Sequence, residues 1–111
     1  MSMHPITDKA ELALDFPDKT YIGSFSRASS FEARIDPEGA TIKLAHTSGE
    51  RRVAELHLHW YLFADILKEL AASIAAGAEI DDAHRRPLEE AAAAFARALG
   101  QSQREASQEK P

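Results

Sequence analysis

The chain contains no cysteine, and this absence excludes disulfides, thiolate metal ligands and cysteine nucleophiles together. No apolar stretch near its start has the roughly 7–15 residues of a signal peptide. No later run approaches the roughly 18 apolar residues that span a bilayer. We therefore expect a cytoplasmic protein with no membrane partner; the lack of cysteine fits a reducing compartment or a simple lack of need for disulfides.

Glycine is scarce, and its five copies stand alone along the chain. Isolated glycines cannot form the Gly-x-Gly-x-x-Gly or Walker loops that cradle phosphates, and no serine lies in a Gly-x-Ser-x-Gly elbow. Neither His46 nor His84 has a positioned acid or base partner at a spacing that the sequence reveals. We therefore expect the protein to act by binding a partner, and not by catalysis.

A positive charge balance is also lacking, since 13 basic residues face 18 acidic ones and the net charge is −5. Such a chain repels polyanions unless its basic residues gather on one surface. Only Arg27, Arg51 and Arg52 are placed to cluster, at one end of the sheet predicted below. Single-stranded nucleic-acid binding is therefore an unfavoured third hypothesis.

What is present is a long alternation of apolar and polar residues from Thr20 to His59. Turn sequences rich in serine, glycine, proline and acidic residues divide it. The pattern predicts four antiparallel strands joined in sequence order as a meander, at about 19–26, 30–36, 40–46 and 51–59. Residues 10–16 alternate as well, and either a fifth strand or a short helix fits them.

The alternation separates two faces of the predicted sheet. Across the second turn we expect Ile35 to lie opposite Ile42, and Ala33 opposite Leu44. One face then becomes the core, and it collects Tyr21, Gly23, Phe25, Phe31, Ala33, Ile35, Ile42, Leu44, Ala54, Leu56 and Leu58.

Helical spacing of apolar residues begins after the last strand. The first helix is expected to end at Gly77 with a left-handed cap. The second is expected to carry Pro87 in its first turn and to end at Gly100. We predict an α+β fold: an antiparallel four- or five-stranded meander followed by two α-helices packed on one face. We expect residues 1–18 to be a leader that can include a short strand or helix, residues 19–100 to be a single α+β domain, and residues 101–111 to be a disordered tail.

The sharpest chemical signal is the pair His57 and His59. Two residues apart on a strand, both imidazoles point to the same side and can share a divalent transition-metal ion. Glu55 lies in the same row but is roughly 13 Å from His59 along the strand, too far to share that ion. A third ligand must therefore come from His84, His4 or a second chain. No other cofactor is indicated.

About 80 residues carry the predicted fold, and a core of that size supplies only a few kcal/mol, so association is a common source of extra burial. Our leading hypothesis is a small protein-interaction module that forms a homodimer and can bind a protein partner. Metal or small-ligand binding at the histidine pair is the alternative. The candidate interface residues are apolar side chains on the open sheet face and around the start of the first helix: Ile22, Val53, Trp60, Tyr61 and Leu62.

Overall fold

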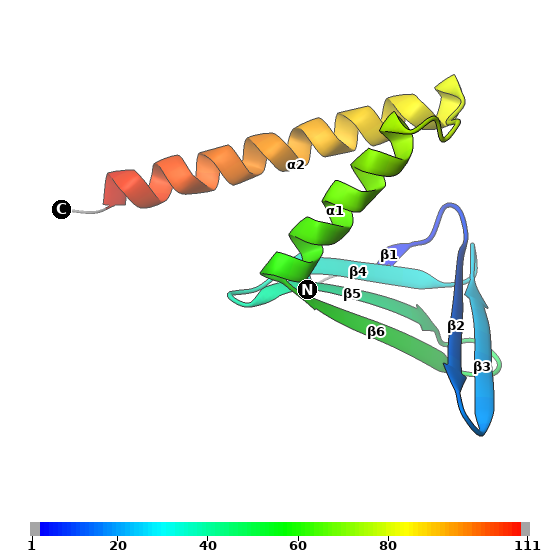
Figure 1. Ribbon diagram of the computed structural model, residues 1–111. Helices are drawn as coiled ribbons and strands as arrows, with labels where there is room; N and C mark the ends of the chain where they lie inside the picture. The colour runs from blue at the N-terminus through cyan, green and yellow to red at the C-terminus, as the bar shows by residue number, and fades with distance from the viewer. Residues whose placement is uncertain (1–2, 110–111) are drawn as a thin grey trace. The chain divides into compact units, whose positions relative to one another are not determined.

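The computed structural model describes residues 3–109, with side chains through residue 102. Six strands precede two helices (Figure 1). The chain forms two compact units, residues 1–70 and 71–111. In order the elements are β1 (His4–Pro5), β2 (Ala10–Phe16), β3 (Lys19–Phe25), β4 (Ser30–Ile35), β5 (Gly39–His46), β6 (Arg52–His59), α1 (Trp60–Ala75) and α2 (Asp82–Glu109).

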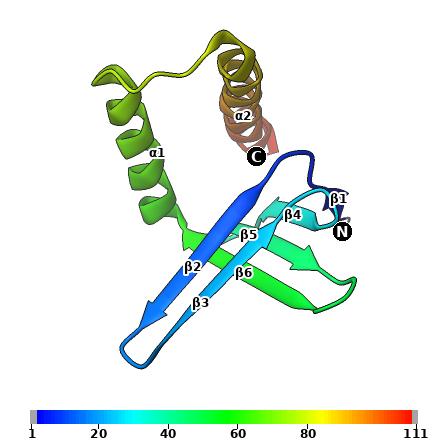
Figure 2. The ribbon, with the colours of Figure 1, turned by 90° about the vertical axis from the view of Figure 1, so that its right-hand side faces the viewer.

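The strands form two antiparallel sheets. One has four strands in the order β1-β4-β5-β6, and the other is the hairpin β2–β3. Figure 2 shows this hairpin running across the strands of the larger sheet. The α+β class and the antiparallel four-stranded sheet followed by two helices are confirmed.

The composition of that sheet differs from the predicted meander. Residues 10–16, for which strand and helix were both open, form β2, which pairs with β3 from Ala10 opposite Phe25 to Phe16 opposite Lys19. The strand predicted at 19–26 therefore belongs to the hairpin, and β1 takes the expected place beside β4. The tight turn after Phe16 explains the pairing of β2 with β3, because it closes one strand onto the other over a very short loop. The Thr20 hydroxyl adds a hydrogen bond to the Asp15 carboxylate, 2.7 Å long.

The register between β4 and β5 is shifted by two residues from the predicted one. Ala33, not Ile35, lies opposite Ile42. The cause is a tighter turn: the Asp36 N–H donates to the Gly39 carbonyl at 2.9 Å and leaves only two residues in the loop. Because side chains alternate with a period of two, this shift leaves every residue on its predicted face.

The predicted core face is only partly buried. Phe25 is 2% exposed and Leu58 is 9% exposed, whereas Leu56 is 54% exposed and Ile35 is 57% exposed. The expectation that Tyr21, Ile35, Ile42 and Leu56 are core residues is thus wrong, since all four are exposed. Whether a residue on this face is buried depends on which other elements pack over it. In helix α1, Trp60–Ala75, all of which the structure describes, no side chain is buried.

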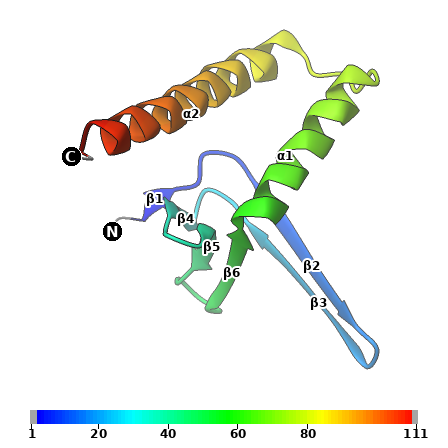
Figure 3. The same cartoon turned by 60° about the vertical axis from the view of Figure 1, so that its left-hand side comes forward.

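Helix α1 follows β6 without a loop (Figure 3). It ends as predicted, because Gly77 has φ of 112°, a left-handed conformation that glycine adopts without steric cost. The Gly77 N–H donates to the Ile74 carbonyl and the Ala78 N–H to the Ser73 carbonyl. These two bonds form a Schellman motif, which satisfies carbonyls at the helix end.

Helix α2 is longer than predicted at both ends. It begins at Asp82, so Pro87 lies inside the helix and not in its first turn. Asp81 acts as the N-cap, since its carboxylate accepts the His84 N–H at 3.3 Å. The helix also continues past Gly100 through residues that favour helix, to Glu109, into the predicted disordered tail. Residues 110 and 111 of that tail lie outside the described residues. Among the described helices, none is long and apolar enough to cross a bilayer.

The tightest backbone approach in the sheet predicts a sensitive position. A Cβ atom on Gly39 would lie 2.0 Å from the Leu58 carbonyl oxygen and 2.8 Å from the His59 Cα. Because both neighbours are backbone atoms, which cannot move aside cheaply, we expect Gly39→Ala to lower the free energy of unfolding by about 1–3 kcal/mol. Urea unfolding followed by circular dichroism measures this effect.

Gly100→Ala is the matched control. A Cβ there meets nothing within 4 Å, and alanine favours helix over glycine by up to about 1 kcal/mol. We expect this variant to be as stable as the wild type or more so. Equal unfolding of wild type and Gly39→Ala would show that the close approach does not constrain the fold.

Candidate metal centre

His57 and His59 lie together on the polar face of β6. Across the sheet, His57 is opposite Thr41 and His59 is opposite Gly39. The two imidazole centroids are 4.8 Å apart, with the ring planes at 56°. The predicted same-side placement of the pair is therefore found in the structure.

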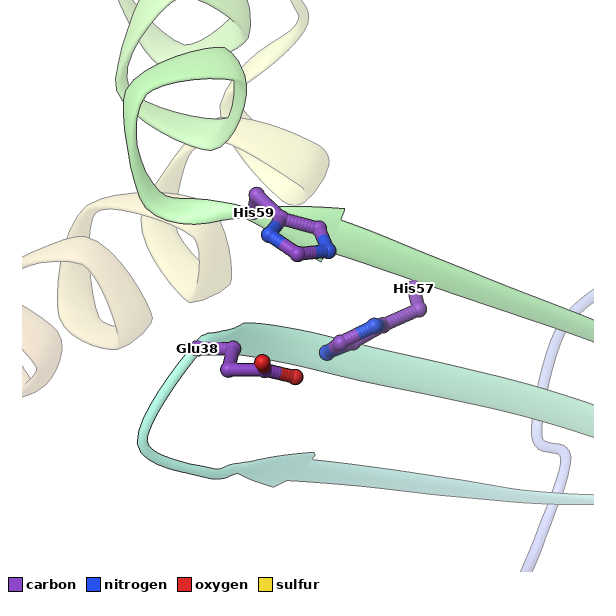
Figure 4. A group of neighbouring side chains, drawn as sticks. All are labelled: Glu38, His57 and His59. Carbon is purple, nitrogen blue, oxygen red and sulfur yellow. The ribbon is translucent and has the colours of Figure 1, made fainter.

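The third side chain of the cluster is Glu38, in the turn between β4 and β5. Glu38, His57 and His59 each offer a ligand atom, and these atoms lie within 4.8 Å of one another (Figure 4). The register explains the convergence, since Gly39 is paired with His59 and Glu38 precedes it directly. All three residues are exposed to solvent.

Sequence reasoning missed Glu38 and expected the third ligand from elsewhere. His4 packs against Phe31 at a centroid distance of 5.5 Å. His84 belongs to residues 71–111 and is bonded to Asp81. A usable signal was nevertheless present. The turn between the second and third predicted strands carries acidic residues, and antiparallel pairing brings that turn to the end of the last strand.

The turn that carries Glu38 is held by the residue that follows the histidine pair. The Trp60 indole N–H donates to the Pro37 carbonyl at 3.1 Å. The Trp60 backbone N–H donates to the Glu38 carbonyl at 3.3 Å. These bonds fix the backbone of Glu38 relative to the end of β6. Trp60, predicted as an interface residue, is 39% exposed and also has this structural role.

Asp36 connects the turn to His57. Its Oδ1 accepts the backbone N–H groups of Glu38 at 2.8 Å and of Gly39 at 2.9 Å. Its Oδ2 lies 3.2 Å from His57 Nε2. The Glu38 N–H holds the pKa of Asp36 below its usual value, and the Gly39 N–H and His57 act in the same direction while partial burial opposes them. Asp36 is thus an anionic group in contact with Nε2 of His57.

Two other histidines have partners that the sequence did not reveal. His46 Nδ1 lies 2.9 Å from the hydroxyl of the buried Ser29. His84 Nδ1 bonds to the Asp81 carboxylate, and this bond lowers the pKa of Asp81. The first pair joins the loop before β4 to the end of β5, and the second joins the start of α2 to its cap. The positions of His46 and His84 are therefore explained by hydrogen bonds that connect parts of the fold.

The predicted interface residues are exposed. Ile22 is 82% exposed and Tyr61 is 90% exposed. Val53 lines an apolar groove of about 310 Å³ between the hairpin and the larger sheet. The other residues that line this groove are Leu12, Leu14, Ile42, Leu44, Ala54, Glu55 and Leu56.

The basic residues considered for nucleic-acid binding are partly engaged within the fold. Arg52 donates to the Ser24 carbonyl at 2.8 Å, and its guanidinium lies over the Phe25 ring, 5.4 Å from the centroid. Arg52 therefore joins β6 to the hairpin.

Comparison with protein families, with curated proteins and with solved structures finds no match for this chain.

The lowered pKa of Asp36 predicts how its contribution to stability depends on pH. A carboxylate whose folded pKa is depressed stabilises the fold above its usual pKa of 3.8, and this contribution is lost as the pH falls through the lower folded value. We expect wild type to resist urea better than Asp36→Asn at about pH 7, and we expect this advantage to shrink toward about pH 3.

The control is Asp18→Asn, in the turn between β2 and β3. It reports how the loss of one carboxylate from a different turn affects unfolding over the same pH range. An advantage of wild type over Asp36→Asn that stays constant from neutral to acidic pH would contradict the proposed role of the Asp36 charge.

Proposed function

We propose that the protein binds a divalent transition-metal ion through His57, His59 and Glu38. The observation that carries the proposal is the convergence of these three side chains, from a strand and a turn, with ligand atoms within 4.8 Å of one another. Each ligand of a zinc ion lies about 2.0–2.2 Å from it, so the three side chains would have to draw their ligand atoms closer together when an ion binds.

The donor set favours one class of ion. Two imidazoles and one carboxylate suit zinc and its neighbours among the divalent transition metals, whereas calcium and magnesium prefer oxygen ligands alone. Three protein ligands leave one position of a tetrahedral ion for water or another ligand. The proposal is therefore a zinc-class site with an open position.

The backbone around the cluster supports the proposal because it is held in place without an ion. Two hydrogen bonds from Trp60 hold the Pro37 and Glu38 carbonyls. The Asp36 carboxylate accepts the backbone N–H of Glu38 in the turn, and it also lies beside His57. A site whose backbone is already fixed loses less conformational freedom when the ion binds, so this arrangement favours affinity.

Solvent exposure of the three ligands supports reversible binding over a structural role. Structural zinc sites are closed, four-coordinate and required for folding. Here the hydrogen bonds of the turn and the pairing of β5 with β6 account for the local fold. We therefore propose that the ion exchanges with solvent. A cytoplasmic location remains a prediction from the sequence.

Titration calorimetry with Zn²⁺, and with Co²⁺ as an optical probe, tests the proposal. An outer-shell partner of a metal site contributes about 10–100-fold in affinity, so we expect removal of a ligand to cost more than about 100-fold. His57→Ala and His59→Ala should each show this loss. Glu38→Gln should lower affinity as well, and its nearly unchanged shape should preserve the turn.

His46→Ala and His84→Ala are the matched controls. Each removes one imidazole from a position outside the cluster. Both should bind the ions as wild type does, and circular dichroism should confirm that every variant is folded. Wild-type affinity in folded His57→Ala, or no measurable binding by wild type, would disprove the site.

A further inference from the structure

Strand β6 is an edge strand with little protection against pairing. It is the last strand of the order β1-β4-β5-β6, and among the described residues only β5 pairs with it as a strand. Its eight residues pair with β5 without interruption and include no proline, glycine or lysine. Natural edge strands use proline, bulges and charged side chains, lysine above all, to prevent pairing with another chain. The charged residues of β6 are Arg52 and Glu55. The free edge is therefore a candidate interaction surface.

The residues of β6 are arranged in two rows. Ala54, Leu56 and Leu58 point to the apolar face, where Leu56 is 54% exposed. Val53, Glu55, His57 and His59 point to the other face. A partner strand must match both rows, because directly opposite residues share a face.

A second copy of β6 matches both rows when it runs antiparallel about Leu56. Leu56 then lies opposite Leu56 of the partner subunit, and Ala54 lies opposite Leu58 of the partner subunit. On the other face, Glu55 lies opposite His57 of the partner subunit, and the symmetry repeats this acid and imidazole pair. Moving the axis to Glu55 would instead place two like charges opposite each other, which is unfavourable.

We propose that the protein forms a homodimer in which two β6 strands pair antiparallel about Leu56. The two four-stranded sheets then become one continuous sheet, and the exposed apolar rows of both copies lie side by side. The interface is isologous, as in most homodimers. This proposal does not rest on metal binding, although it places Glu55 of the partner subunit beside His57.

The absence of cysteine makes the register directly measurable. Opposite residues of an antiparallel pair have Cα atoms about 4.5–5.5 Å apart, a separation that a disulfide can bridge. We expect Leu56→Cys to form a covalent dimer rapidly under mild oxidation in the presence of EDTA. Non-reducing electrophoresis measures the yield, and light scattering of wild type at tens of micromolar should give the mass of a dimer.

Val53→Cys is the matched control, because Val53 is on the same strand and is 45% exposed. In the proposed register its two copies are six residues out of alignment, or about 20 Å apart. We expect at least tenfold slower crosslinking for this variant. Equal crosslinking of the two variants, or a strictly monomeric wild type, would overturn the proposal.

A second pair of variants tests the register without altering Leu56. Glu55→Cys and His57→Cys proteins, one of them carrying an affinity tag, should crosslink to each other when mixed, and each should do so slowly with itself. EDTA removes metal ions, so failure of this experiment is distinguishable from failure of the metal site. A mixture that yields only self-crosslinked products would contradict the register even if the protein is a dimer.

Discussion

The close approach of the β4–β5 turn to the end of β6 is the contact on which the rest of this structure depends. Gly39 allows the approach, since any Cβ atom there would collide with the backbone of Leu58 and His59. Trp60 then holds the turn through its indole and backbone N–H groups. A contact between backbone atoms leaves little freedom, and it therefore sets the register of β5 and β6 and the position of Glu38.

This contact explains how a small exposed cluster can be ordered. The histidines are held by the strand, and the carboxylate is held by a turn that the same strand end supports. Asp36 adds a negative charge that lies beside His57 and accepts backbone N–H groups of the turn. The local backbone and the electrostatic environment of the cluster therefore come from one short stretch of sequence.

Strand β6 carries both of our proposals because its two faces and its edge are separate surfaces. The row of His57 and His59 holds two of the proposed metal ligands, Ala54 and Leu56 of the apolar row line the groove together with Val53 and Glu55, and the free edge is available for main-chain hydrogen bonds. Alternation with a period of two keeps these surfaces apart. A strand of eight residues can therefore contribute to a metal site and to an interface without using the same backbone groups.

The sequence by itself determined the features that depend on neighbouring residues. Alternation predicted the strands and their faces, the pair His57 and His59 was predicted to share one side, and Gly77 was predicted to end α1. Local geometry produces each of these. Only the tertiary structure decided that β2 pairs with β3, that Ala33 lies opposite Ile42 and that Leu56 stays exposed. It also decided that Glu38 joins the histidines. These outcomes depend on turn closure and on contacts between distant residues, where alternatives differ by small free energies that no local pattern records.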